Sequence, residues 1–327
     1  MTANSAVAQA HPNIAFIKYW GNKDEILRLP ENGSISMNLQ ALHTRTTATI
    51  DHDASADTLS INGEVQEGLA LSRARQYLEK VREIYSISGK LRITSENNFP
   101  MAAGIASSAS AFAALAAAVN ALFELELNSD YLSALARLGS GSASRSVPPG
   151  YCEWFPGKTH ADSYARSIAD SDHWQLWDCV AVVAKEEKKI GSTQGHKLAS
   201  TSPLQDARLK NADERLSICR EAIFKKDFEQ LAAVIELDSD MMHAVMMTSR
   251  PPIMYWQGAS VSIMHEIRRL RSRGIEAAYT LDAGPNVHII STPDAIRKIE
   301  DHFRGFNGIS SLITSPVGDG ARLISVN

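Results

Sequence analysis

One segment restricts the folds open to this chain more than any other: a run of small residues that leads from a predicted strand into an alanine-rich helix. The strand ends near Ser95, and the helix carries on one stripe Phe112, Leu115, Val119 and Leu122. The many alanines of the helix indicate close packing against a sheet. Between strand and helix lies the sequence Pro100-Met101-Ala102-Ala103-Gly104-Ile105-Ala106-Ser107-Ser108-Ala109-Ser110.

Small residues allow the backbone of this segment to approach a ligand closely. Free N–H groups at the start of a helix, together with the helix dipole, stabilise a polyphosphate. Ser107 and Ser108 add hydroxyls that can cap the helix, contact phosphate or hold Mg²⁺. The segment is not a Walker A motif, because no Gly-Lys-Ser/Thr follows it. Taken alone, it leaves two interpretations open: a phosphate-binding loop, or a tightly packed helix with a serine N-cap.

The composition is that of a globular protein with one large domain or two ordinary ones. Of its 327 residues, 44% are hydrophobic and 21% are charged, so a packed core is feasible. The net charge is −4, and no cluster of Lys and Arg indicates nucleic-acid binding. The apolar stretch Ala109–Val119 is too short to cross a bilayer, and the N-terminus lacks the pattern of a secretory signal. We therefore expect a cytoplasmic protein that binds neither nucleic acid nor membrane.

The three cysteines, Cys152, Cys179 and Cys219, are odd in number and include no CxxC pair. This usage predicts buried, reduced thiols rather than disulfides or metal ligands. The histidines show no spacing typical of a zinc site. The sequence therefore predicts no metal site built from protein side chains alone.

Hydrophobic spacing predicts strands and helices that alternate throughout the chain. In the first half we expect strands at 44–50, 59–61 and 91–93, and helices at 71–85 and 130–138, the last ending at Gly139. A continuous apolar run predicts a buried strand at 179–184. Beyond it we expect helices at 206–225, 227–247, 258–273 and 293–303, and strands at 277–281, 287–290, 311–314 and 322–326. This pattern favours an α+β fold.

Four polar clusters accompany the small-residue segment. Lys18-Tyr19-Trp20-Gly21 sets a cation among aromatic rings, and Gly139–Ser146 combines hydroxyls with Arg145, whose planar guanidinium suits a carboxylate or phosphate. Gly191–Gly195 is a small polar turn, and Asp282–Asn286 places a carboxylate at the end of an apolar strand. Taken singly, each cluster also has an ordinary structural interpretation, as a turn, a surface cation or a structural ion pair.

Together these residues resemble the small-molecule kinase superfamily that contains galactokinase, homoserine kinase and mevalonate kinase. Within it, they are most similar to the ATP-dependent mevalonate diphosphate decarboxylases. The matching stretches follow the family's order from the N-terminus to about residue 286. They are Asn13–Ala15, Ile17–Gly21, Leu29-Pro30, Ser34–Ser36, Ser95–Pro100 with the small-residue segment, Gly139–Ser146, Ser192–Gly195, Pro251–Ile253 and Asp282–Asn286.

The resemblance implies a two-domain α+β fold with the active site in the cleft between the domains. The N-terminal α/β domain would contain an unusual left-handed βαβ crossover, and the C-terminal domain would be ferredoxin-like. We place the first domain at 1–187 and the second at 188–327. The resemblance also implies a homodimer, although no stripe of the sequence identifies an interface.

The resemblance further implies a reaction. ATP, with Mg²⁺, phosphorylates the tertiary 3-hydroxyl of a phosphorylated mevalonate, and the 3-phosphate then leaves as the neighbouring carboxylate departs as CO₂. A tertiary hydroxyl is a poor nucleophile, so Asp282 would act as a base or an orienting group. Lys18 would offset negative charge beside it, and Arg145 would grip the substrate carboxylate.

The resemblance assigns the remaining site residues to two groups. One group would bind the substrate: Tyr19, Asn22, Ser140, Ser142 and Ser192, the last contacting the 5-phosphate. The other would bind the nucleotide phosphates through Met101, Ala102, Ala103, Gly104, Ile105, Ala106, Ser107 and Ser108, with Ser108 on the γ-phosphate and Ser107 available to Mg²⁺.

The sequence departs from the family at position 22. Members that act on the diphosphate usually carry a Lys there, whereas this chain has Asn22, and Lys23 would point to the opposite face of an extended segment. A charge-assisted contact contributes ~1.5–3 kcal/mol. We therefore expect mevalonate 5-phosphate as substrate and isopentenyl phosphate as product, with mevalonate 5-diphosphate and isopentenyl diphosphate as the alternative. A mevalonate 3-kinase and a non-catalytic ligand sensor are further alternatives. Pro148-Pro149 also replaces the family's aromatic-Gly, without a functional explanation.

Overall fold

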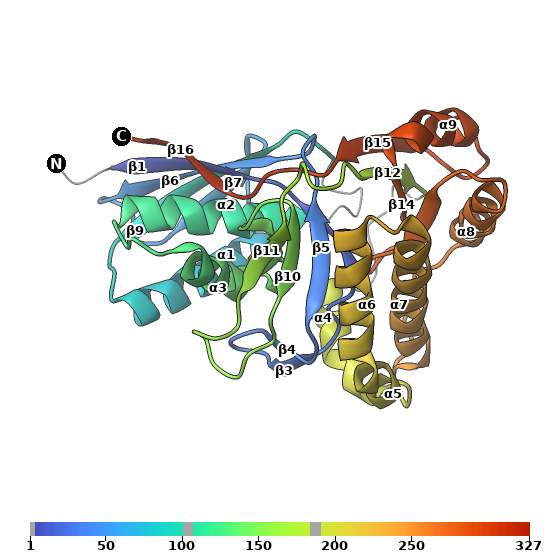
Figure 1. The fold of residues 1–327 in the computed structure, drawn as a ribbon. Coiled ribbons are helices and arrows are strands. Elements are labelled where there is room, and N and C mark those ends of the chain that lie inside the picture. The colour runs from blue at the N-terminus through green and yellow to red at the C-terminus, as the bar shows by residue number, and fades with distance from the viewer. Residues whose placement is uncertain (1–3, 101–106, 184–190) are drawn as a thin grey trace.

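A computed structural model describes residues 4–100, 107–183 and 191–327. Its N-terminal part is built on a six-stranded sheet in the order β16-β1-β6-β9-β7-β8 (Figure 1). Strands β7 and β9 pair in parallel and the other neighbours are antiparallel. The strands are β1 (Ser5–Ala10), β6 (Thr44–Asp51), β7 (Thr58–Ile61), β8 (Glu64–Val65), β9 (Lys90–Asn97) and β16 (Arg322–Val326).

Helix α1 (Gly68–Tyr85) joins β7 to β9 and forms the expected βαβ unit, whose hand stays a prediction. Helix α2 (Ser107–Leu122) packs on the same sheet and shares a core with α3 (Ser129–Gly139). The alanines of β1 meet those of α2 in this core. Because methyl groups occupy little space, helix and sheet approach closely, which confirms the packing expected from the sequence.

A second sheet, in the order β11-β10-β5-β2, covers the other side of α3. Its strands are β2 (Asn13–Ile17), β5 (Ser34–Asn38), β10 (Tyr151–Trp154) and β11 (Ala165–Ala169). The short helix η2 (Gly141–Ser146) links α3 to this sheet, and a two-stranded hairpin, β3 (Asn22–Asp24) with β4 (Leu29–Pro30), connects β2 to β5.

The C-terminal part has the predicted ferredoxin-like arrangement. Its antiparallel sheet has the order β13-β14-β12-β15 and is covered by two helices. The elements are β12 (Trp177–Val182), α8 (Gly258–Arg271), β13 (Ala277–Thr280), β14 (Val287–Ser291), α9 (Pro293–Phe303) and β15 (Ser311–Pro316). Between β12 and α8 lie α4 (Ser192–Leu198), η3 (Ala199–Thr201), α5 (Gln205–Lys210), α6 (Ala212–Lys225) and α7 (Phe228–Thr248).

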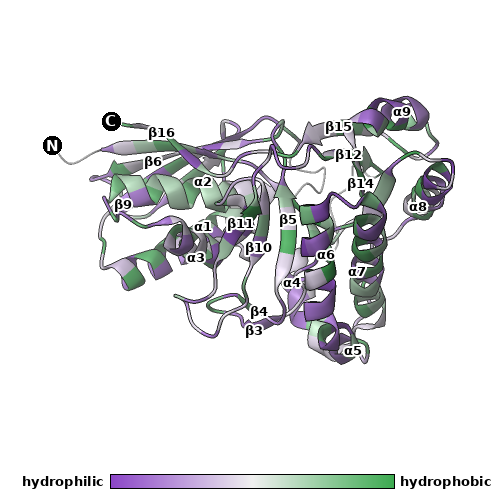
Figure 2. Cartoon of the chain, viewed as in Figure 1, coloured by the Kyte–Doolittle hydropathy of each residue, from purple (hydrophilic) through white to green (hydrophobic). Residues whose placement is uncertain are grey.

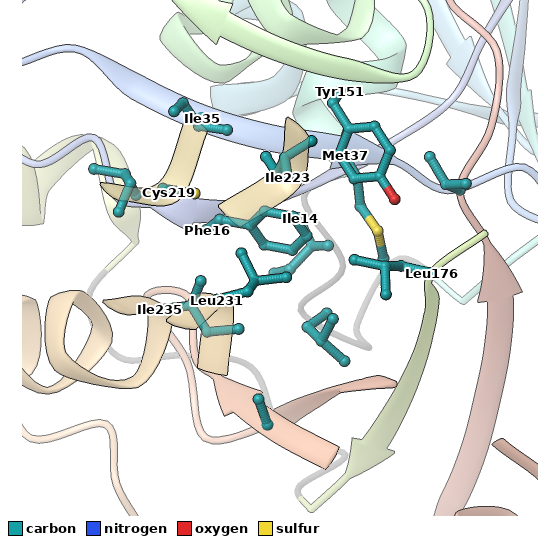
Figure 3. Close-up of a cluster of buried hydrophobic side chains, with 14 of the residues drawn as sticks. Ile14, Phe16, Ile35, Met37, Tyr151, Leu176, Cys219, Ile223, Leu231 and Ile235 are labelled. Carbon is teal, nitrogen blue, oxygen red and sulfur yellow. The ribbon is translucent and has the colours of Figure 1, made fainter. Parts of the chain in front are cut away.

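One core connects the two parts. Ile14, Phe16 and Ile35 from β2 and β5 pack against Ile223 and Leu231 from α6 and α7 (Figure 3). Figure 2 shows hydrophilic residues on the viewer-facing side of α6 and hydrophobic residues on β5 beside it. The relative positions of the N-terminal and C-terminal site residues are therefore held by apolar packing.

The division of the chain at 187/188 stays a prediction. Strand pairing supports an earlier boundary, because β12 belongs to the C-terminal sheet. Strand pairing also assigns the last strand to the first domain, because β16 pairs with β1. We therefore propose that the first domain ends before residue 177 and also includes residues 322–326.

One expectation about helices was wrong in detail, and another was confirmed. The helix expected at 206–225 is broken at Asn211 into α5 and α6. Helix α3 ends at Gly139, as expected, and Ser140 follows in an extended conformation. A Cβ at Gly139 would lie 2.0 Å from Cδ1 of Phe112, so close helix packing requires the glycine.

The cysteines are free and buried, as predicted. Burial raises the pKa of the Cys179 thiol to about 12, so the thiol stays protonated and unreactive. Within residues 4–100, 107–183 and 191–327, no helix combines the length and apolarity needed to span a bilayer.

Candidate active site

Lys18 and Asp282 form the centre of the site. Lys18 follows β2 and is 1% exposed, while Asp282 follows β13 by two residues. The Lys18 ammonium donates to Asp282 Oδ1 at 2.7 Å, and the Asp282 side chain remains 29% exposed. Desolvation lowers the pKa of Lys18, and the neighbouring Asp282 opposes that shift. The structure therefore brings together two residues from opposite ends of the chain, as the sequence predicted.

A buried ionic network fixes the backbone at Lys18. The Lys18 N–H donates to Asp238 Oδ2 of α7 at 2.6 Å, and Arg215 Nε donates to the other carboxylate oxygen at 2.7 Å. Arg208 Nη2 donates to the Lys18 carbonyl at 2.7 Å. Because Asp238 and both arginines are buried, these bonds hold Lys18 in one position.

Arg145 lies in η2 and is 3% exposed. Its guanidinium donates to Ser34 Oγ at 2.5 Å and to Asn13 Oδ1 at 3.2 Å, and its buried Nε has no hydrogen-bond partner in the described part of the chain. Desolvation lowers the Arg145 pKa to about 10, whereas the charge of Asp282 raises it. Arg145 is thus a buried cation with neutral partners close to Asp282, which suits it to an incoming carboxylate.

Three serine hydroxyls link η2 to the start of α2. Ser108 Oγ lies 3.2 Å from Ser140 Oγ, which lies 3.1 Å from Ser142 Oγ. Ser108 was predicted to contact phosphate, and Ser140 and Ser142 to contact substrate. Their hydrogen bonds join the two predicted subsites into one polar surface, formed by Ser108, Ser140 and Ser142, which we call the serine surface.

Next to Ser108 lies a cavity of about 200 Å³ between β7, β9, α1 and α2. Its lining includes apolar residues such as Leu59, Ile61 and Ile93 together with Ser107, Ser108 and Arg73. Arg73 was not among the predicted site residues, because one arginine on an amphipathic helix is typical of a solvated surface. The remaining predicted nucleotide ligands, Met101, Ala102, Ala103, Gly104, Ile105 and Ala106, lie outside the described residues.

Tyr19 and Asn22 meet at the entrance to the β3–β4 hairpin. The Tyr19 hydroxyl donates to Asn22 Oδ1, and Asn22 Nδ2 donates to Glu25 Oε1 at 3.0 Å. Burial raises the Tyr19 pKa, so the phenol remains protonated. The Tyr19 ring packs on Gly141, where a Cβ would lie 2.6 Å from Tyr19 Cε1. Tyr19 therefore lies beside η2 and Asn22 is hydrogen-bonded to Tyr19, while the contact of both residues with substrate stays a prediction.

Ser192 is exposed at the first residue of α4, and its contact with substrate stays a prediction. One turn later on α4, His196 stacks on Tyr19 with ring centroids 4.1 Å apart, and its Nδ1 accepts from the Gly21 N–H at 3.1 Å. Desolvation lowers the His196 pKa to about 3, so the ring is neutral. This histidine was not predicted from the sequence, and it connects α4 to the Lys18–Gly21 segment.

The fold and this set of site residues define a two-domain protein of the small-molecule kinase superfamily. Residues 10–165 match the family described as diphosphomevalonate decarboxylase-like N-terminal domain, and residues 179–321 match the mevalonate 5-diphosphate decarboxylase C-terminal domain. The chain belongs to the mevalonate diphosphate decarboxylase family.

Individual relatives agree with this assignment. The diphosphomevalonate decarboxylase of Saccharomyces cerevisiae is 40% identical over 88% of this chain and 77% of its own length. The mevalonate diphosphate decarboxylase of Staphylococcus aureus superposes with a TM-score of 0.93 and 38% identity, over 98% of each chain. A structure described as MDDEF in complex with MVAPP, AMPPCP and magnesium superposes with a TM-score of 0.94 and 35% identity, over 98% of this chain and 99% of that one.

Proposed function

We propose that this chain catalyses the ATP-dependent decarboxylation of mevalonate 5-diphosphate to isopentenyl diphosphate. The observation that carries the proposal is the meeting of Lys18, Asp282 and Arg145 in one site, from three distant segments. Phosphoryl transfer followed by decarboxylation requires a carboxylate, here Asp282, and two cations, here the buried side chains of Lys18 and Arg145.

Each of these residues has a task in the reaction. Asp282 accepts the proton of the tertiary 3-hydroxyl as that oxygen attacks the phosphoryl group. Lys18, 2.7 Å from Asp282, offsets the negative charge that gathers around the transferred phosphoryl group. Arg145 holds the substrate carboxylate. When the 3-phosphate leaves, the bond to the carboxylate breaks, its electron pair forms the carbon–carbon double bond, and CO₂ departs.

The nucleotide site proposed here is the cavity beside α2. ATP with Mg²⁺ supplies the phosphoryl group when bound. The apolar walls of the cavity suit a base, and Ser107 and Ser108 at its lining suit phosphates. The complex of a similar protein with AMPPCP and magnesium supports ATP and Mg²⁺ as the nucleotide and the metal ion.

The number of substrate phosphates is the finer part of the proposal. We expected mevalonate 5-phosphate from Asn22, but the yeast and human relatives, 40% and 38% identical, are both named diphosphomevalonate decarboxylase, which supports the diphosphate. Mevalonate 5-phosphate remains the second candidate, because Asn22 is uncharged and its Nδ2 is engaged by Glu25.

A substrate panel tests the proposal. The purified chain, ATP and Mg²⁺ are combined with mevalonate, its 5-phosphate or its 5-diphosphate, and ADP, phosphate and CO₂ are measured. We expect equal amounts of all three products, with the highest kcat/KM for the diphosphate. A higher kcat/KM for the 5-phosphate would favour the second candidate. ADP without CO₂ would indicate a 3-kinase, and ligand binding without turnover a sensor. Sedimentation of the same sample tests the predicted homodimer.

A further inference from the structure

Two arginines from different elements meet at the C-terminal end of α3. Arg28, at the end of the β3–β4 hairpin loop, donates from Nε to the Leu138 carbonyl at 3.1 Å. Arg73 of α1 donates from Nη2 to the Gly139 carbonyl at 3.4 Å. These carbonyls belong to the negative end of the helix dipole, which attracts cations. Both guanidinium groups are thereby held next to Ser140, the first residue after the helix.

Neither arginine is neutralised within the described part of the chain. No carboxylate there forms an ion pair with Arg28 or Arg73, and the buried Arg73 Nε has no hydrogen-bond partner. Burial, and then the charge of Arg28, lowers the Arg73 pKa to about 10. Two like charges held together in a partly desolvated place repel each other, and an anion bound between them would remove that repulsion.

The backbone of Arg28 is also unusual. Its φ is +52°, in the left-handed region that residues other than glycine rarely adopt. Residues other than glycine persist in this region where the surrounding structure enforces it, and such positions cluster at functional sites. The side chain of Arg28 is also incompletely bonded: its two terminal guanidinium nitrogens make no hydrogen bond to any residue in the described ranges.

Arg28 contacts the carbonyl of Leu138, two residues before Ser140 of the serine surface. Its positive charge acts on both Tyr19 and His196, whose rings stack on each other. A substrate with its carboxylate on Arg145 and its C3 beside Asp282 would extend past Tyr19 toward the hairpin. The groups that meet its far end are the Tyr19 hydroxyl, the serine surface and Arg28.

We propose that Arg28 binds the outer phosphate of the substrate's 5-diphosphate, with Arg73 beside it. This inference rests on the proposed function and extends it to a specificity-determining residue. The β3–β4 hairpin would then supply from position 28 the positive charge that Asn22 lacks. The hairpin lacks a cation at position 22 but carries one at position 28. This exchange would preserve the affinity of the site for the dianionic outer phosphate.

The test is equilibrium binding, because binding does not require turnover. Calorimetry measures the Kd of mevalonate 5-diphosphate and of mevalonate 5-phosphate for the wild type, Arg28→Gln and Arg28→Lys. We expect Arg28→Gln to weaken diphosphate binding by about 10- to 150-fold, the range of one charge-assisted contact. Monophosphate binding should change by less than threefold, and Arg28→Lys should recover part of the loss. Steady-state kinetics should show a raised KM for the diphosphate with kcat nearly unchanged.

Lys23→Gln is the matched control, because it removes one exposed cation from the same hairpin. We expect it to bind the diphosphate as the wild type does. Arg28→Gly separates binding from folding, since glycine adopts the φ of +52° without strain. It should unfold at the wild-type temperature or above it and still bind the diphosphate weakly.

Two failures can be told apart. If Arg28→Gln binds the diphosphate within threefold of the wild type, or no more weakly than Lys23→Gln, the assignment of Arg28 is wrong. If the wild type decarboxylates mevalonate 5-phosphate with the higher kcat/KM, the proposed function is wrong. The two results come from different measurements.

Discussion

The Lys18 ammonium and the Asp282 carboxylate lie 2.7 Å apart although their positions in the chain differ by 264. Lys18 is held by Asp238 of α7 through its own backbone, and the Leu281 N–H before Asp282 donates to Ser239 Oγ of the same helix at 3.0 Å. One helix of the C-terminal part therefore positions both partners of the ion pair. This rigidity makes the consequences of single substitutions predictable.

Asp282→Asn should reduce turnover by at least about 100-fold, because general-base catalysis contributes about 10²–10⁴-fold. Asparagine keeps the shape of the side chain and its hydrogen-bond acceptor but cannot take a proton. ATP affinity, measured by fluorescence titration, should stay close to that of the wild type, since the proposed nucleotide cavity is lined by other residues. Asp301→Asn, at a position with a 75% exposed side chain, is the matched control and should retain full activity.

The same substitution also leaves Lys18 buried without its carboxylate, which lowers stability. The double variant Lys18→Met/Asp282→Asn removes the unpaired charge. We expect its melting temperature to exceed that of Asp282→Asn while its turnover remains as low. If the double variant regained activity together with stability, or if Asp282→Asn kept turnover within tenfold of the wild type, Asp282 would not act in the chemistry.

Arg145→Lys should lower kcat/KM for the phosphorylated mevalonate by about 10- to 150-fold, equivalent to ~1.5–3 kcal/mol. Lysine keeps the charge but loses the planar fork that can hold a carboxylate through two hydrogen bonds. The KM for ATP should change little. Arg304→Lys, at a position with a 75% exposed side chain, provides the control. Equal kinetic constants for Arg145→Lys and the wild type would show that the fork does not hold the substrate.

Site residues could be predicted from the sequence where they belong to recognisable motifs. Motif residues such as Lys18, Arg145 and Asp282 could be recognised because the family resemblance orders them along the chain. Strands β2 and β5 were not predicted, because each is buried on both faces and includes polar residues, so hydrophobic alternation is missing. Arg28 and Arg73 gave no signal, since a single cation in a turn or helix is usually solvated. Tertiary contacts alone reveal that these two arginines share one helix end.

Acid should destabilise the protein partly through His196. Its pKa is about 3 in the folded chain, because of desolvation, against about 6.5 in an unfolded chain. The unfolded state therefore binds more protons below pH 6.5, so this contribution to stability is complete above pH 6.5 and is lost as the pH falls. Between pH 7.5 and pH 5 the loss attributable to His196 is about 1–2 kcal/mol.

Denaturant unfolding of His196→Gln at pH 7.5 and pH 5 measures this contribution. The glutamine side-chain oxygen can still accept from the Gly21 N–H, and glutamine does not titrate. We expect the free energy of unfolding to fall less between the two pH values than it does for the wild type. His52→Gln, at an exposed position, should leave the pH dependence as it is in the wild type. An identical pH dependence in His196→Gln and the wild type would contradict the buried, neutral state of His196.

Gly139→Ala should destabilise the fold and disturb the serine surface at once. A Cβ at this position would lie 2.0 Å from the ring of Phe112 on α2, and overpacking of this kind costs about 1–3 kcal/mol. Because Ser140 follows directly and contacts Ser108, displacement of α3 should also raise the KM for substrate. Gly258→Ala is the matched control, since a Cβ there meets nothing within 4 Å and the residue begins α8. Equal free energies of unfolding for the two variants would show that α2 and α3 can separate without loss, and that Gly139 is not required for their contact.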